Sequence, residues 1–146
     1  MSKLRIPDAC HTQCLEAKGC RGKDPWLPRC LGHEASGVVV DIGSDVTRAA
    51  PSDRVALSWI KAKGIEAGGS TYDWAERTVN AGAVKTFKRH VVVSENRVTV
   101  LPTTLDLRQA TLLGCALPTV LGVVINVGKP DNSESVAVFG AGGVGL

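Results

Sequence analysis

Three residues that lie far apart in the sequence carry side chains able to bind a metal ion: Cys10, His33 and Cys115. Two thiolates and one imidazole form a ligand set that zinc favours, and three protein ligands leave the fourth position of a tetrahedral ion open. An open position is typical of a catalytic zinc site rather than a structural one. The wide spacing agrees with this interpretation, because structural sites usually take their cysteines in closely spaced pairs.

The other three cysteines leave a competing metal site open. Together with Cys10 they would form a local four-thiolate module, but their spacings are irregular for such a module. We favour the simpler interpretation that Cys14, Cys20 and Cys30 are small hydrophobic residues. The odd total of five cysteines and an expected reducing compartment argue against disulfide bonds.

The composition is that of an ordinary globular domain. The chain has 146 residues, of which 44% are hydrophobic and 21% charged, so one domain with a sizeable core is possible. Its net charge of +3 is scattered, and the densest basic group, Lys85–His90, fits an exposed strand edge better than a nucleic-acid surface. No apolar run has membrane-spanning length, and the N-terminus lacks the apolar stretch of a secretory signal. We therefore expect a cytoplasmic protein with no nucleic-acid and no membrane partner.

The part of the chain before Pro102 favours short strands. A short helix, with Thr12 as a possible cap and Gly19 at its end, interrupts them. The stretch 61–83 is rich in glycine and polar residues, which predicts a long loop with room for a hairpin. Apolar and β-branched runs bounded by turn residues predict strands at 4–6, 38–42, 54–59, 89–93 and 97–101.

After Pro102 the pattern becomes helical. Asp106 and Gln109, three residues apart, match a capping box, and Gly114 ends the helix that they open. Pro118 suits the first turn of a second helix, because a proline there loses no internal hydrogen bond. We therefore predict two helices that follow the β-rich part.

The chain ends with an apolar strand, predicted at 135–139, and a glycine-rich turn. Gly140, Gly142 and Gly145 form the pattern G-x-G-x-x-G directly after that strand. In dinucleotide-binding folds such a turn admits a pyrophosphate close to the backbone at the start of a helix. The acidic residue that would bind the cofactor ribose is expected about twenty positions later, beyond residue 146. The sequence therefore predicts the start of a dinucleotide-binding domain.

Five motifs occur together in an order that resembles the zinc-dependent alcohol dehydrogenases of the medium-chain dehydrogenase/reductase superfamily. This resemblance implies a mainly β, partial GroES-like catalytic domain with two helices over 1–128. It also implies the first strand and turn of a Rossmann domain over 129–146, for an overall α+β class. The motifs are Cys10-His11-Thr12, Gly32-His33-Glu34-Ala35-Ser36-Gly37, Pro51-Ser52-Asp53-Arg54-Val55, Gly114-Cys115 and the run from Gly140 to Leu146.

The resemblance also implies roles for individual residues. Cys10, His33 and Cys115 would bind one catalytic zinc, Glu34 would lie behind the metal, and Thr12 would bind the substrate oxygen and start a proton relay. His11 would face the cofactor pyrophosphate, while Thr119 and Val144 would line the nicotinamide. The full set of implied cofactor-binding residues is His11, Thr119, Gly140, Gly142, Gly143, Val144 and Gly145.

Structural roles remain open for several of these residues. Thr12 is at least as well explained as a helix cap, and Thr119 as a residue of a first helical turn. His11 fits an exposed polar side chain, and Glu34 an ordinary salt-bridge partner. Each of these roles explains the residue type without any chemistry.

The chain departs from the family pattern at several places. Relatives usually have an acidic residue where this chain has Gln13, which weakens support for the histidine ligand. Leu15 stands where relatives often place a relay histidine. No cysteine lies between Leu31 and Gly114, so we expect no structural zinc. The chain also begins late relative to the family pattern.

The implied reaction is the interconversion of a small-molecule alcohol and aldehyde, with hydride transfer to or from NAD or NADP. We expect this chain to be a catalytic-domain fragment that is inactive in isolation, because it contains only the first edge of the cofactor domain. Two alternatives remain: a non-catalytic zinc-binding module, and a zinc-free relative of the reductases. Full-length relatives often form homo-oligomers.

Overall fold

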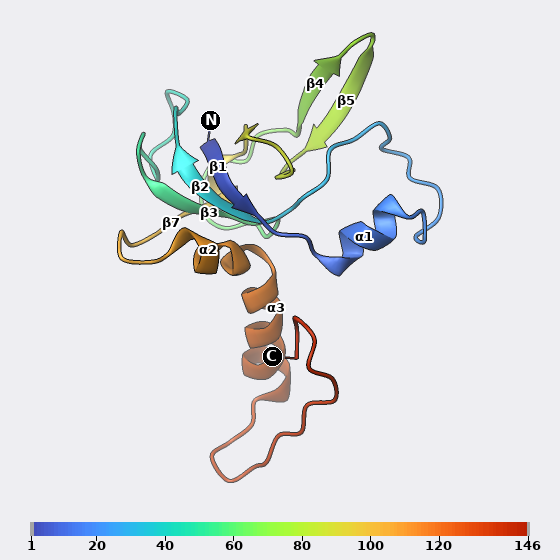
Figure 1. Cartoon of the computed structure of the whole chain (residues 1–146). Coiled ribbons are helices and arrows are strands. Elements are labelled where there is room, and N and C mark those ends of the chain that lie inside the picture. The colour runs from blue at the N-terminus through green and yellow to red at the C-terminus, as the bar shows by residue number, and fades with distance from the viewer. Residues whose placement is uncertain (1, 146) are drawn as a thin grey trace.

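A computed structural model describes residues 2–145 of the chain (Figure 1). Its main element is a five-stranded antiparallel sheet with the order β6-β1-β2-β3-β7. A separate hairpin of β4 and β5 projects from the side of this sheet. The strands are β1 (Ser2–Pro7), β2 (Ala35–Val39), β3 (Arg54–Leu57), β4 (Ser70–Trp74), β5 (Arg77–Gly82), β6 (His90–Val91) and β7 (Val98–Val100).

The sheet separates two small hydrophobic cores. Alternate residues of a strand point to opposite faces, so Val55 and Leu57 of β3 belong to one core and Ala56 to the other. Helices cover the second core, where Ala56 packs with Leu101 and Ala110. The first core consists of Ala35, Val39, Val55, Leu57, Val84 and Val91.

Short helices connect and cover the strands. The α2 helix begins where the sequence predicts, because the Asp106 side chain accepts a hydrogen bond from the Arg108 amide (2.6 Å). The α2 helix continues directly into a 3-10 helix, η2. The α3 helix continues into a π-helix, η3. The helices are α1 (His11–Ala17), η1 (Glu95–Arg97), α2 (Leu107–Ala110), η2 (Thr111–Gly114), α3 (Ala116–Gly122) and η3 (Val123–Gly128).

Two buried hydroxyl groups attach the helices to the sheet. Thr111 donates to the carbonyl of Ile6 in β1 (2.8 Å), and Ser36 of β2 donates to the carbonyl of Leu107 (2.6 Å). The two hydroxyl oxygens lie 3.0 Å apart, and both side chains are buried. Because unpaired polar groups are costly inside a protein, these contacts fix η2 and the residues after it relative to β1 and β2.

The α+β class is confirmed, and the stretch predicted as a long loop with room for a hairpin contains the hairpin of β4 and β5. Three local predictions are wrong. The residue at the N-cap of α1 is Cys10, and Thr12 lies inside the first turn. The strand predicted at 38–42 begins at Ala35, because the small residues before Val38 let the strand pack closely under the helices. Cys14 and Cys20 are exposed and do not pack as hydrophobic residues.

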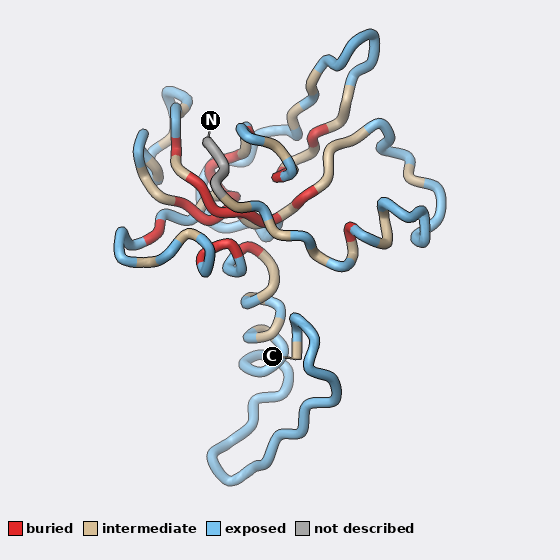
Figure 2. The backbone as a smooth tube through the Cα atoms, viewed as in Figure 1, coloured by how far each residue is buried: buried red, intermediate tan, exposed pale blue. Residues whose placement is uncertain are grey.

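The strand predicted at 135–139 is not formed. Its residues are exposed and pair with no strand, and Phe139 is 99% exposed, because the described chain offers no neighbouring strand for pairing. Figure 2 shows exposure increasing along α3 and dominating the segment after it. Among the described residues no single helix is long and apolar enough to cross a membrane. The segments 107–114 and 116–128 pass that criterion only as a pair bent by 55°.

Glu95 joins two loops at one end of the sheet. One carboxylate oxygen accepts hydrogen bonds from the amides of Thr47 and Arg48 (both 2.7 Å), and the other accepts from the amide of Ile65 (2.9 Å). These amides, led by that of Ile65, lower the pKa of Glu95. The charged carboxylate therefore contributes stability above its ordinary pKa of 4.5, and this contribution is lost as the pH falls through the lowered value.

We predict that Glu95→Gln lowers the urea midpoint of unfolding at pH 7, because an amide cannot accept hydrogen bonds at both positions. The difference from the unchanged chain should shrink as the pH is lowered from 5 to about 2, since acid also neutralises Glu95 itself. Urea titrations at several pH values measure this difference. Glu76→Gln, at the exposed turn of the hairpin, is the matched control and should leave the midpoint unchanged. A constant difference at all pH values would contradict the account.

Candidate metal centre

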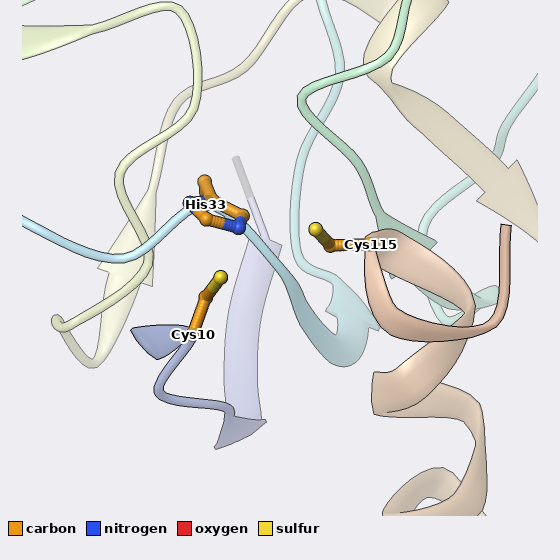
Figure 3. A group of neighbouring side chains, drawn as sticks. All are labelled: Cys10, His33 and Cys115. Atoms are coloured by element: carbon orange, nitrogen blue, oxygen red, sulfur yellow. The ribbon is translucent and has the colours of Figure 1, made fainter. Parts of the chain in front are cut away.

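Cys10, His33 and Cys115 lie together although more than eighty residues separate the last two. One potential ligand atom from each residue lies within 4.8 Å of the others. Figure 3 shows the two sulfur atoms and the imidazole ring pointing toward a common space. Cys10 precedes α1, His33 precedes β2, and Cys115 connects η2 to α3. Among the described residues, no other group of three or more His, Cys, Asp or Glu side chains is close enough to bind one metal ion.

Gly32 and Thr86 determine the position of His33. Gly32 has a φ of +91°, and a Cβ atom there would lie 2.6 Å from the Phe87 nitrogen, so this backbone path requires glycine. The Thr86 hydroxyl donates to the carbonyl of Glu34 (2.9 Å), on the other side of His33. Nε2 of His33 is buried and has no hydrogen-bond partner. A buried nitrogen without a partner, beside two sulfur atoms, fits a metal ligand.

Gly114 and Glu34 determine the position of Cys115. A Cβ atom at Gly114 would lie 2.5 Å from Glu34 Cβ and would also clash with the carbonyl oxygen of Leu57. The Ser58 hydroxyl donates to the carbonyl of Gly114 (2.6 Å), and Glu34 accepts from the amide of Ala116 (3.3 Å). Glu34, which is 2% exposed, therefore connects the start of β2 to the segment that carries Cys115.

The electrostatic environment favours uncharged side chains in the absence of a metal. Burial, followed by the positive charge of Lys85, lowers the pKa of His33, so the imidazole is held in the neutral form that metals bind. Burial raises the pKa of the Cys115 thiol, although the neighbouring Trp59 opposes this effect. Burial also raises the pKa of Glu34. Metal binding must then displace a proton from Cys115, which makes metal affinity depend on pH.

Gln13 replaces the expected acidic residue and contacts His33 directly. Its side-chain oxygen accepts from the Gly32 amide (2.5 Å), so its NH₂ group faces Nδ1 of His33 at 3.0 Å. An NH₂ group can only donate, and Nδ1 must therefore accept. In the neutral ring the proton then resides on Nε2, the nitrogen that faces the two cysteines. A carboxylate at position 13 would accept from both groups and would leave Nε2 free to bind a metal.

The other predicted site residues occupy varied positions. Thr12 is half-buried in α1 and His11 is exposed there. Thr119 lies in the first turn of α3, where it donates to the carbonyl of Cys115 (2.7 Å). The turn at 140–145 and Val144 belong to the exposed segment after α3, and Gly140 has a φ of +103°.

A cavity of about 550 Å³ lies beside His33, and no feature of the sequence predicted it. Trp59 and Lys85 line it, and Trp59 also interacts with the Cys115 thiol. Trp59 stands at the end of a predicted strand, and Lys85 begins the basic group predicted to be an exposed strand edge. Neither position therefore indicated a cavity in the sequence. Trp26 and Arg29, which lie in the segment between α1 and β2, also line the cavity.

Residues 6–103, which are more than half of the chain, match the family model of the alcohol dehydrogenase GroES-like domain. The chain therefore belongs to this family, and the family prediction made from the sequence is confirmed.

Curated relatives agree with this assignment. The chain is 31% identical over 172 residues to alcohol dehydrogenase class-P of Arabidopsis thaliana, covering 99% of the chain and 45% of that protein. It is 30% identical over 171 residues to S-(hydroxymethyl)glutathione dehydrogenase of Photobacterium damsela subsp. piscicida, covering 99% of the chain and 46% of that protein. The chain thus spans less than half the length of these relatives.

Solved structures show the same fold. A protein from Rhizobium etli CFN 42 that is assigned as a zinc-dependent alcohol dehydrogenase superimposes with a TM-score of 0.62 at 25% identity, over 99% of this chain and 37% of that one. The apo form of the JamJ enoyl reductase superimposes with a TM-score of 0.60 at 18% identity, over 88% of this chain and 34% of that one, which shows the fold alone.

We predict that Gln13→Glu tightens zinc binding about 10-fold or more, which is the usual size of effect for a group that orients a histidine ligand. The glutamate has nearly the same length as glutamine and accepts a hydrogen bond from Nδ1–H, so that Nε2 carries no proton. Competition with a chromophoric chelator measures the affinity. Gln109→Glu adds the same charge at an exposed position of α2 and should leave it unchanged. Equal affinity for Gln13→Glu and the unchanged chain would refute this role of Gln13.

We predict that Gly114→Ala destabilises the chain by about 1–3 kcal/mol, the usual cost of forcing atoms into a packed site, and weakens zinc binding as well. The added methyl group must displace β3 or β2, which moves Cys115 away from the other two residues. Thermal unfolding and zinc titration measure the two effects. Gly68→Ala is the control, since a Cβ atom there has no neighbour within 4 Å. Zinc affinity that is unaffected by Gly114→Ala would show that this close approach does not position Cys115.

Proposed function

We propose that this chain is the catalytic part of a zinc-dependent alcohol dehydrogenase, which interconverts an alcohol and an aldehyde with NAD or NADP. The observation that supports the proposal best is the convergence of Cys10, His33 and Cys115 from three separate segments. The family match and the names of the relatives agree with it. In this proposal residues 1–128 form the catalytic domain and 129–146 begin the cofactor domain.

The three ligand residues would bind one zinc ion and leave one position for substrate. Two thiolates nearly neutralise the charge of a zinc ion, which when bound polarises an alcohol oxygen. The buried, unpartnered Nε2 of His33 and the donor set of two sulfurs and one nitrogen fit this metal. Glu34 supports the site from behind through the amide of Ala116.

The proton of the alcohol must leave through residues of this chain. In the proposal Thr12 Oγ1 accepts a hydrogen bond from the substrate hydroxyl and passes the proton onward. Leu15 cannot carry a proton, so the proton leaves from Thr12 to water rather than along a side-chain relay. The exposed position of His11 in the same turn of α1 leaves room for solvent there and for the cofactor pyrophosphate.

The segment 129–146 supplies only the start of a cofactor site. Gly140, with its positive φ, makes a turn that other residues rarely adopt, and the NH groups after it would approach the pyrophosphate. The segment is exposed over almost its whole length and has no paired strand. Thr119 and Val144 would complete the nicotinamide contacts only with the rest of a cofactor domain. We therefore propose that the chain of 146 residues binds zinc but does not turn over.

We predict that the purified chain, after zinc loading and dialysis, retains one zinc per chain by elemental analysis. Cys10→Ser, His33→Ala and Cys115→Ser should each reduce this ratio well below one, because each removes one of three ligands. Cys20→Ser is the matched control, since that thiol is exposed and outside the group. Zinc content that is unaffected by the ligand variants would refute the metal site and favour a zinc-free reductase relative.

An assay for alcohol-dependent reduction of added NAD or NADP separates the remaining alternatives. We expect no detectable turnover from the 146 residues, and turnover from a longer protein that contains a complete cofactor domain. A longer zinc-loaded protein that remains inactive with all alcohols would favour the non-catalytic zinc-binding module. Turnover by the chain alone would show that the segment 129–146 is sufficient for cofactor binding.

A further inference from the structure

The cavity beside His33 is positioned to accept the part of a substrate that does not react. Its volume is about 550 Å³. His33 itself lines it, and Trp59, also in its wall, interacts with the Cys115 thiol. Trp26 adds a second aromatic side chain to the wall. A molecule whose hydroxyl group faces the three metal ligands would therefore extend between aromatic surfaces.

Three basic residues line this cavity, and two of them are already neutralised. Arg29 pairs with Glu16 (3.0 Å) and also with Asp24. Arg97 pairs with Glu66 (3.1 Å) and donates to the carbonyl oxygen of Trp59. These two guanidinium groups are engaged within the protein and have little need of an external anion.

Lys85 is different from both arginines. Its side chain is half-buried, and no carboxylate of the described residues lies within 4 Å of its amine. Burial and then the neighbouring charge of Arg29 lower the pKa of Lys85, against smaller opposing effects of Glu16, Asp24 and Cys30. A partly buried ammonium group without a partner is stabilised by an anion that supplies charge and hydrogen-bond acceptors.

We propose that the substrate of this site is an alcohol or aldehyde that carries a carboxylate, and that Lys85 binds this carboxylate within the cavity. The inference rests on the proposed function, because the metal-binding group identifies which end of the substrate reacts. One ammonium group matches one carboxylate charge, and Trp26 and Trp59 offer apolar contact to the carbon skeleton between the two ends. Lys85 is then a residue that determines specificity, not one that takes part in the chemical step.

The test compares two ligands of the same shape with the zinc-loaded chain. The ligand 4-(hydroxymethyl)benzoate carries the carboxylate, and its methyl ester does not. Quenching of tryptophan fluorescence reports binding, since Trp26 and Trp59 line the cavity, and calorimetry provides a second measurement. We expect the carboxylate to bind at least 10-fold more tightly than the ester. Lys85→Met should remove this preference, and Lys85→Arg should preserve it.

Lys63→Met is the matched control, because this exposed lysine lies outside the cavity and its removal should leave the preference intact. Circular dichroism verifies that each variant is folded, and Lys85→Gln replaces Lys85→Met if that variant is not. Three results would overturn the proposal: no preference for the carboxylate, binding of neither ligand, or a preference that persists without Lys85. The last result would show that the carboxylate binds elsewhere, such as on the metal.

Repeating the comparison without metal separates this proposal from the proposed function. If the chain binds no zinc but Lys85→Met still abolishes the preference, the cavity binds anions and the metal assignment is wrong. If the chain binds one zinc and the carboxylate has no advantage, the metal assignment stands and the role of Lys85 is wrong.

Discussion

The candidate metal centre depends on one close approach between backbones. Gly114 lies against the carbonyl oxygen of Leu57 and the side chain of Glu34, at distances that leave no space for a Cβ atom. Through this contact the segment that carries Cys115 reaches the same place as His33, which directly precedes Glu34 in the chain. The hydrogen bonds from Ser58 and to Glu34 then fix the orientation of this segment. Without the close approach, Cys115 would belong to an exposed helix with no relation to the sheet.

Buried polar side chains, rather than hydrophobic ones, connect the three ligand segments. Thr86 connects the loop after β5 to the backbone beside His33, and Gln13 connects α1 to Gly32. Ser36 and Thr111 connect β2 to the helices. Such contacts are specific in direction, because a buried donor or acceptor that loses its partner is costly. The two hydrophobic cores are small, so these directional contacts carry much of the precision that a metal site needs.

The sequence was sufficient to predict which residues converge, but not how they are supported. Cys10, His33 and Cys115 could be selected because thiol and imidazole groups in a known order resemble one family, and the α+β class follows from the same pattern. The orientation of the Gln13 amide could not be predicted, since it depends on the Gly32 amide in a turn that only coordinates reveal. The environment of Lys85 was equally hidden, because the burial of its side chain and its position beside Arg29 depend on the fold. The strand predicted at 135–139 failed for a simple reason: an apolar run becomes a strand only beside another strand.

X-ray absorption at the zinc edge of the loaded chain tests the central claim most directly, because it counts the atoms bound to the metal. We expect two sulfur ligands at about 2.3 Å and one imidazole nitrogen at about 2.0–2.1 Å, with a light atom from solvent in the fourth position. Four sulfur ligands would instead indicate the local cysteine module formed by Cys10, Cys14, Cys20 and Cys30. A spectrum with no sulfur ligand would contradict the account altogether, since it would show that the two thiols do not bind the metal.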